Sequence, residues 1–162
     1  MLVRSWEVTL PHDKGDIIRG LGFVTLNSAY LEEQIDNLLI MLISVEDFTE
    51  KVQRWPVSSK IKKAKQVAAK FEFEGRDDLV ATLDRAGVAF KKRNEIVHGR
   101  IYGSFDRPDT LKSGRPNIPT REIASTELNE LANHLSDLQK EVSRPMVSKL
   151  PKALTGNGDA KA

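Results

Sequence analysis

The stretch KKRNEIVHGR, residues 91–100, combines three residue types that could act on a phosphodiester. The guanidinium of Arg93 is a rigid, charged fork of N–H donors that matches phosphoryl oxygens. The imidazole of His98 can accept a proton and release it again, as a general acid or base does. Asn94 adds a side-chain amide that can donate and accept hydrogen bonds. Together they form a minimal set for phosphodiester chemistry.

The position of these side chains on a helix raises the question of what they face. A helix is expected over residues 77–98, with Gly99 where a C′ glycine would close it. At about 100° per residue, Arg93 and Asn94 fall on the two shoulders of the apolar stripe, and His98 lies one turn beyond Asn94. The stripe consists of Leu79, Leu83, Ala86, Phe90 and Val97. Polar groups buried there without partners would cost several kcal/mol, so they must face a ligand, a polar neighbour or a crevice.

A purely structural interpretation of the same residues is also available. Asn94 could hydrogen-bond His98 within the helix, and His98 could interact with the negative end of the helix dipole. Arg93 could pair with a carboxylate of the acidic first helix, for which the candidates are Glu32, Glu33 and Asp36.

Three other segments show helical periodicity, at residues 15–43, 59–73 and 126–147. Asp13 or Asp16 could cap the first, Ser58 or Ser59 the second and Ser125 the last. Pro145 is expected to kink or end the last helix. The predicted inward residues are Ile17, Leu21, Val24, Ser28, Leu31, Ile35, Leu38, Leu39 and Leu42 in the first, Ile61, Ala64, Val67, Ala68 and Phe71 in the second, and Leu128, Leu131, Leu135, Leu138 and Val142 in the last.

The remaining segments complete the predicted fold. Residues 100–125 form a long loop without helical period, with a weakly signalled hairpin around 101–105 and 118–123. Residues 151–162 are expected to be a disordered tail. The sequence therefore predicts one domain over residues 1–150, an all-α, four-to-five-helix up-and-down bundle with a long loop before the last helix.

Composition and charge limit the classes of protein. The chain has 162 residues, a net charge of +2 and no Cys, which excludes disulfides and thiolate zinc sites and favours a cytoplasmic protein. The longest apolar run, residues 38–43, is far too short to span a bilayer, so no membrane partner is expected. Charges are segregated: residues 28–50 hold six acids and no Lys or Arg, whereas residues 91–121 hold eight Lys or Arg and three acids. Such basic regions can attract a polyanion, although the five Lys of residues 58–70 are also typical of a solvated helix face.

The motif RNEIVHG, residues 93–99, resembles the signature of the HEPN superfamily, in which Arg is followed by a polar residue, often Asn, and then by His after four to six intervening residues. Helix order and the loop before the last helix also fit, so the resemblance covers about residues 16–147. It implies a HEPN-type bundle that acts as a metal-independent endoribonuclease, typically a toxin or an anti-phage effector. It also implies a homodimer that brings two copies of the motif into one cleft.

The resemblance implies a catalytic role for Arg93, Asn94 and His98. A ribose 2′-hydroxyl would attack the adjacent phosphorus, so that RNA is cut and DNA is not. Arg93 would stabilise the charge on the phosphoryl oxygens, His98 would transfer the proton, and Asn94 would orient His98 or bind phosphate. No cofactor is expected, and His12, His98 and His134 lack the spacing of metal ligands.

Basic and aromatic residues around the motif are candidate RNA contacts. The expected RNA-binding residues are Lys91, Lys92, Arg100, Tyr102 and Arg107, with Arg115, Arg121 and Phe105 as further candidates. A minimal nucleotidyltransferase is a possible antitoxin partner by the same resemblance. Two other interpretations stay open: a noncatalytic HEPN-like module that binds RNA or a nucleotide, and a helical interaction protein in which Arg93 forms an internal salt bridge.

Overall fold

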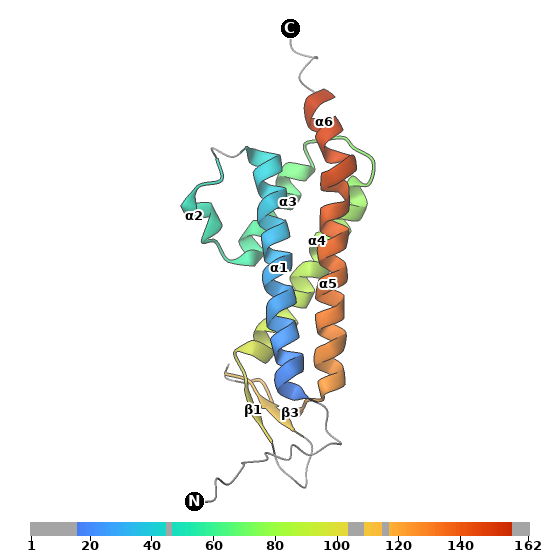
Figure 1. The fold of residues 1–162 in the computed structure, drawn as a ribbon. Coiled ribbons are helices and arrows are strands. Elements are labelled where there is room, and N and C mark those ends of the chain that lie inside the picture. Colours follow the sequence, from blue (N-terminus) through green and yellow to red (C-terminus); the bar gives the residue numbers. More distant parts are fainter. Residues whose placement is uncertain (1–15, 45–46, 104–108, 115–116, 157–162) are drawn as a thin grey trace, which may run out of the picture.

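The computed structural model describes residues 16–44, 47–103, 109–114 and 117–156, and these residues are mostly helical (Figure 1). The first helix, α1, spans Ile17–Ile43. It begins after Asp16, whose Oδ1 accepts a hydrogen bond from the Arg19 N–H at 2.8 Å, which confirms this predicted cap. The predicted apolar stripe is confirmed from Val24 onward, whereas Ile17 and Leu21 are only partly buried against the core. The buried residues of α1 are Gly20, Val24, Ser28, Leu31, Ile35, Leu38, Leu39 and Leu42.

Two short helices and one long helix follow: α2 at Glu50–Gln53, α3 at Val57–Ala68 and α4 at Arg76–Val97. The predicted serine cap of α3 was wrong, because Pro56 is the cap residue and both serines lie inside the helix. A proline needs no N–H partner at this position, and it directs the chain into the first turn. Gly75 precedes α4 with a φ of 86°, a left-handed conformation that favours glycine.

The last two helices are α5 at Ser125–Ser148 and α6 at Leu150–Gly156. All five predicted inward residues of α5 are buried, but Ser125 is its first helical residue and not its cap. Pro145 lies within α5, which continues to Ser148. The prediction of a disordered tail was wrong for residues 151–156, because Leu150 is fully buried and Leu154 packs on the core, and these contacts hold the helix against the bundle. Residues 157–162 lie outside the described part of the chain.

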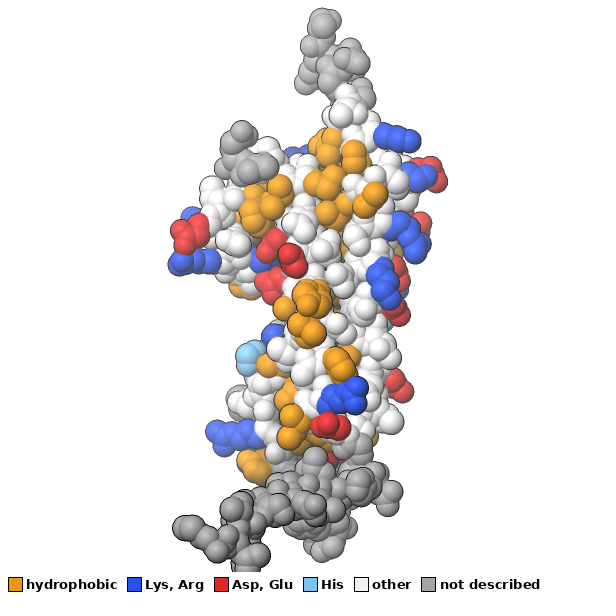
Figure 2. All heavy atoms as spheres, in the orientation of Figure 1, with side chains coloured by type: hydrophobic (Ala, Val, Ile, Leu, Met, Phe, Trp, Pro, Cys, Tyr) orange, Lys and Arg blue, Asp and Glu red, His pale blue; other side chains and the backbone are white. Residues whose placement is uncertain are grey.

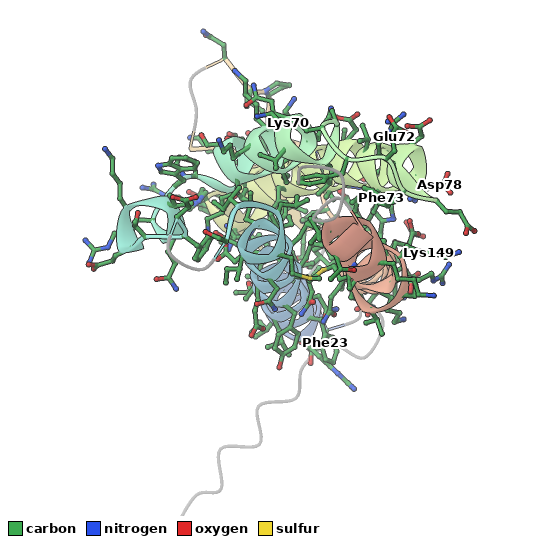
Figure 3. The ribbon with its side chains drawn as sticks, turned by 90° about the horizontal axis from the view of Figure 1, so that it is seen from above. Phe23, Lys70, Glu72, Phe73, Asp78 and Lys149 are labelled. Atoms are coloured by element: carbon green, nitrogen blue, oxygen red, sulfur yellow. The ribbon has the colours of Figure 1, made fainter. Side chains whose placement is uncertain are left out.

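The helices form two layers, with α1 and α5 in one and α3 and α4 in the other (Figure 3). The helices α1 and α5 run in the same direction: a Cβ built at Gly20 would lie 2.9 Å from Leu128 Cβ, and Asn27 Nδ2 donates to the Ala132 carbonyl at 2.9 Å. Thus the predicted up-and-down order was wrong. The segment between α1 and α3 contains only the short α2 at the side of the molecule, so no long helix descends after α1 (Figure 1).

A small antiparallel sheet lies at the end of the bundle where α4 stops and α5 begins (Figure 1). Its strands are β1 at Arg100–Tyr102, β2 at Thr110–Lys112 and β3 at Arg121–Glu122, in the order β1-β2-β3. The predicted hairpin paired the regions of β1 and β3 directly. In the structure β2 lies between these two strands and pairs with both. Leu111 of β2 is buried in the core of the bundle, so its side chain holds the sheet against the helices. Within the described residues no helix is both long and apolar enough to cross a membrane.

Candidate functional site

Arg93 is held in a defined orientation between α1 and α4. Its Nε donates to Ser28 Oγ at 3.2 Å, and its Nη1 donates to Asn94 Oδ1 at 2.9 Å. Ser28 is 1% exposed, and its own hydroxyl donates to the Thr25 carbonyl at 2.8 Å. This bond within α1 fixes the direction of the hydroxyl, whose oxygen accepts from Arg93. These bonds use two of the five N–H donors of the guanidinium. The Arg93 guanidinium forms no ion pair with any of the described residues.

Two of the three acidic residues of α1 that were candidate partners of Arg93, Glu32 and Asp36, pair with Lys60 of α3 instead, and Glu33, which the structure also describes, forms no ion pair with Arg93. Lys60 Nζ lies 2.9 Å from Glu32 Oε1 and 2.9 Å from Asp36 Oδ1. The expectation that the Lys side chains of this helix point outward was therefore wrong for Lys60, which is 2% exposed. It lies one turn before the buried Ala64, on the inner face of α3. An internal salt bridge of Arg93 is thus not formed in the described part of the chain.

Arg93 and Asn94 line a pocket between α1, α3 and α4, which we call the Arg93 pocket. Its volume is about 420 Å³, and its walls include Trp55, Ile61, Phe90, Lys91, Arg93 and Asn94. Volumes of about 300–1,000 Å³ are usual for sites that hold small molecules. The lining combines apolar and aromatic side chains with an amide, two cations and the carboxylate of Glu32. The polar residues at the shoulder of the α4 stripe therefore face a crevice, which is one of the three alternatives that the sequence left open.

His98 lies at the end of α4, outside the walls of the Arg93 pocket. It is exposed, and its backbone N–H donates to the Asn94 carbonyl at 3.2 Å. The side-chain oxygen of Asn94 accepts from Arg93, and among the described residues no hydrogen bond joins the side chains of Asn94 and His98. Gly99 follows as predicted, but space requires it: a Cβ would lie 2.5 Å from Leu111 Cδ1 and 2.8 Å from the Glu95 carbonyl. The close approach of β2 thereby fixes the turn that presents His98.

The other predicted RNA contacts differ in whether they are free to bind an anion. Lys91 is exposed and has no ion-pair partner among the described residues. Arg100 and Tyr102 alternate with the half-buried Ile101 on β1, so they share the exposed face of the sheet. Arg100 is paired directly with Lys112 across the strands. Like charges in this arrangement repel each other, and an anion would relieve the repulsion.

Arg107, Arg115 and Phe105 were further candidates for contacts with RNA. All three lie outside the described residues. Their expected roles therefore stay predictions.

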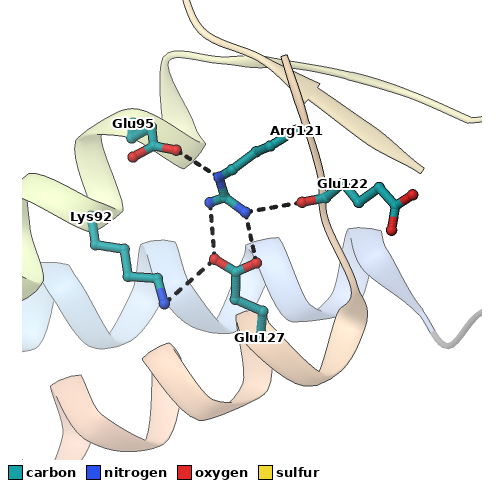
Figure 4. A network of polar contacts seen from close by, with 5 residues as sticks. All are labelled: Lys92, Glu95, Arg121, Glu122 and Glu127. Atoms are coloured by element: carbon teal, nitrogen blue, oxygen red, sulfur yellow. Dashed lines mark hydrogen bonds and ion pairs between the residues drawn. The ribbon is translucent and has the colours of Figure 1, made fainter. Parts of the chain in front are cut away.

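Lys92 and Arg121 are instead held in a charged cluster that joins α4, β3 and α5 (Figure 4). Both oxygens of Glu127 accept from Arg121, at 2.8 and 2.9 Å, and Glu95 Oε1 accepts from its Nε at 2.9 Å. Lys92 Nζ lies 3.4 Å from Glu127 Oε1. A bidentate arginine–carboxylate pair fixes geometry as well as charge. The cluster therefore fastens the sheet beside the motif, and its two cations are engaged within the protein.

Acid should weaken this cluster. Hydrogen bonding from Arg121 lowers the pKa of Glu127 below its ordinary 4.5, so its contribution to the free energy of unfolding is complete above about pH 4.5 and is lost as the pH falls through the folded-state pKa. We expect Glu127→Gln to be less stable than the parent by about 1–2 kcal/mol at about pH 7, and this difference should become smaller at about pH 3. Urea unfolding at both pH values measures the difference.

The matched control for this experiment is Glu122→Gln. Glu122 contributes only its backbone carbonyl to the cluster, which accepts from Arg121 Nη1 at 3.0 Å. Its replacement should leave the stability unchanged at both pH values. If Glu127→Gln lowers the free energy of unfolding equally at both pH values, the loss comes from the packing of the side chain and not from its charge.

Three residues of the site were missed as functional by the sequence analysis: Ser28, Trp55 and Lys60. Ser28 was assigned to the apolar stripe of α1, where a buried hydroxyl is the signal for a polar partner across the interface. Trp55 lies in the break before α3 and had no periodic signal. Lys60 was hidden in a Lys-rich run, although its spacing to Ile61 and Ala64 places it on the buried face.

Comparisons with known proteins add no assignment to this geometry. No family model, no curated protein and no solved structure matches the chain. Among the described residues, no group of three or more His, Cys, Asp or Glu side chains is arranged to hold a metal ion. A function for this chain must therefore be inferred from Arg93, Asn94, His98 and their surroundings.

Proposed function

We propose that this chain is a HEPN-type, metal-independent endoribonuclease whose catalytic residues are Arg93, Asn94 and His98. The observation that carries the proposal is the state of Arg93. Its plane is fixed by Ser28 and Asn94, it has no carboxylate partner among the described residues, and its side chain lines a pocket. A fixed guanidinium with unused donors in a crevice is suited to phosphoryl oxygens.

The proposed reaction is attack of a ribose 2′-oxygen on the adjacent phosphorus. The new O2′–P bond forms as the P–O5′ bond breaks, leaving a 2′,3′-cyclic phosphate and a 5′-hydroxyl. A base takes the 2′-hydroxyl proton and an acid returns a proton to O5′. Arg93 stabilises the charge that builds on the phosphoryl oxygens, and His98 is the proton carrier, one helical turn from Asn94 and open to solvent.

We propose a homodimer, because one imidazole cannot be base and acid in the same step without proton exchange, whereas two copies supply two. The exposed apolar residues Phe23, Leu26 and Tyr30 form a stripe on α1 (Figure 2). In Figure 3, Phe23 points away from α3 and α4, which provide most of the residues that line the Arg93 pocket. The dimer contact that would unite two motifs is therefore at the end of α4 and the exposed face of β1. A role as toxin or anti-phage effector, with an antitoxin such as a minimal nucleotidyltransferase, belongs to the same proposal.

The test is cleavage of RNA in excess EDTA. We expect the purified protein to cut a single-stranded RNA oligonucleotide to products with 2′,3′-cyclic phosphate ends, and to leave the same oligonucleotide uncut when every 2′-hydroxyl is replaced by hydrogen. A protein carrying both Arg93→Ala and His98→Ala, purified in parallel, controls for contaminating nuclease. Equal cleavage by both proteins, or cleavage that requires a metal, contradicts the proposal.

A noncatalytic RNA- or nucleotide-binding module is the second candidate. It is favoured by the position of His98 outside the walls of the Arg93 pocket and by the engagement of Asn94 Oδ1 with Arg93. It predicts salt-dependent binding of the RNA without product in the same assay. Binding that is lost on Arg93→Ala while no cyclic phosphate forms would select this candidate.

A further inference from the structure

The Arg93 pocket has a second wall that the proposed chemistry does not use. Trp55 lies in the turn between α2 and α3, half-buried, with its backbone N–H bonded to the Val52 carbonyl at 3.0 Å. Pro56 follows it and restricts its backbone. Ile61 of α3 and Phe90 of α4 complete an apolar surface on this side. A half-buried indole that lines a partly apolar crevice is a surface on which a planar ring can stack.

The charge of the pocket selects an anion. Lys91 and Arg93 line it and have no ion-pair partners among the described residues. Glu32 also lines it, with Lys60 at 2.9 Å, but Lys60 is shared with Asp36, so these three groups keep one negative charge. The two positive charges of Lys91 and Arg93 exceed it, so the charge around the pocket is positive overall. A ligand that fits this lining needs a flat ring and a negative group.

We propose that the Arg93 pocket binds one nucleotide unit of RNA, with its base against Trp55 and its phosphate at Lys91 and Arg93. The proposal rests on the proposed function in one respect, namely that the phosphate bound there is the scissile one or its neighbour. Base stacking on an aromatic side chain contributes about 1–3 kcal/mol for each base. Binding of the base in the pocket thus positions the substrate, and Arg93 acts on its phosphate.

Gly87 offers a way to close the pocket without removing a side chain. It lies on α4 and lines the pocket, and a Cβ built on it meets no atom within 4 Å. The next residue, Val88, is 67% exposed and is not part of the pocket walls, so Val88→Leu is a matched control on the same helix. Gly87→Leu should fold well, since it also removes a glycine from a helix interior.

The binding experiment uses the full chain with Trp6→Phe, which leaves Trp55 as its one tryptophan. We expect adenosine 3′-monophosphate to quench Trp55 fluorescence with saturation, and to bind at least tenfold more tightly than adenosine or inorganic phosphate. Gly87→Leu should weaken this binding at least tenfold, and Val88→Leu should not change it. In a calorimetric titration, Trp55→Ala should weaken nucleotide binding about 5- to 150-fold, which corresponds to the loss of one stacked base. No saturable quenching, or equal binding by phosphate alone, overturns the proposal.

The cleavage assay separates this proposal from the nuclease proposal. If the parent cuts RNA, Gly87→Leu should raise KM at least tenfold with little change in kcat, because base binding is lost and Arg93 is kept. An unchanged KM in Gly87→Leu, together with no nucleotide binding, overturns the proposal that the pocket binds a nucleotide but does not contradict the nuclease proposal. Nucleotide binding by a parent that never cuts RNA supports the pocket and overturns the nuclease.

Discussion

Replacing Arg93 with lysine should lower kcat for RNA cleavage about 10²- to 10³-fold, the effect of losing one preorganised donor to a developing oxyanion. Lysine keeps the positive charge but lacks the planar fork, and it has three donors where arginine has five, so bonds to Ser28 and Asn94 would leave it at most one donor for phosphate. Because the charge remains, RNA binding at low salt should change much less than kcat. Single-turnover cleavage with saturating protein, together with a binding titration, separates the two quantities.

The matched control is Arg85→Lys. Arg85 is on the same helix, two turns before Arg93, and pairs with Glu141 of α5. It tests whether an arginine-to-lysine change in α4 lowers activity through stability alone. We expect its kcat to stay within about threefold of the parent, and a thermal melt of both variants checks that they are folded. Arg93→Lys with parental activity would remove Arg93 from the catalytic residues.

The buried faces of the long helices could be predicted because each rests on a local pattern. Leu31, Ile35 and Leu38 repeat at helical spacing, and so do Leu128, Leu131 and Leu135, and all six are buried. The edge positions of Arg93 and Asn94 followed from the same geometry, and both residues line a pocket. Such patterns need no knowledge of which helices are neighbours.

The features that the sequence did not reveal depend on contacts between distant segments. The strands have two or three residues each, too few to show a period of two, and β2 is inserted between two regions that seemed to be partners. The parallel arrangement of α1 and α5 depends on the path between α1 and α3, where α2 is a single turn. The Arg93 pocket combines residues of three helices and a turn, and no local pattern indicates that Trp55 and Arg93 line the same pocket.

Lys60 is the clearest case of a residue whose role follows from the tertiary structure. Burial lowers the pKa of a lysine, but its hydrogen bonds with Asp36 and Glu32 outweigh this, so the pKa of Lys60 is raised. Burial raises the pKa of Asp36, and the hydrogen bond from Lys60 opposes that rise. The three charges therefore depend on one another, and the Lys60 ammonium is the centre of the group.

Lys60→Met should consequently destabilise the protein by about 3–5 kcal/mol near pH 7, the usual cost of leaving one partner of a buried ion pair uncompensated. Without Lys60 the pKa of Asp36 rises further, so the variant should regain stability as the pH falls toward the ordinary Asp value of 3.8 and Asp36 takes up a proton.

The double variant Lys60→Met/Asp36→Leu should recover much of the loss, because it removes the buried carboxylate as well. Urea unfolding at about pH 7 and pH 5 measures all three proteins, and Lys62→Met, an exposed position on the same helix, should change stability by no more than about 0.5 kcal/mol. A loss in Lys60→Met that does not depend on pH and is not recovered by the second substitution would mean that the lysine stem, and not its charge, stabilises this part of the core.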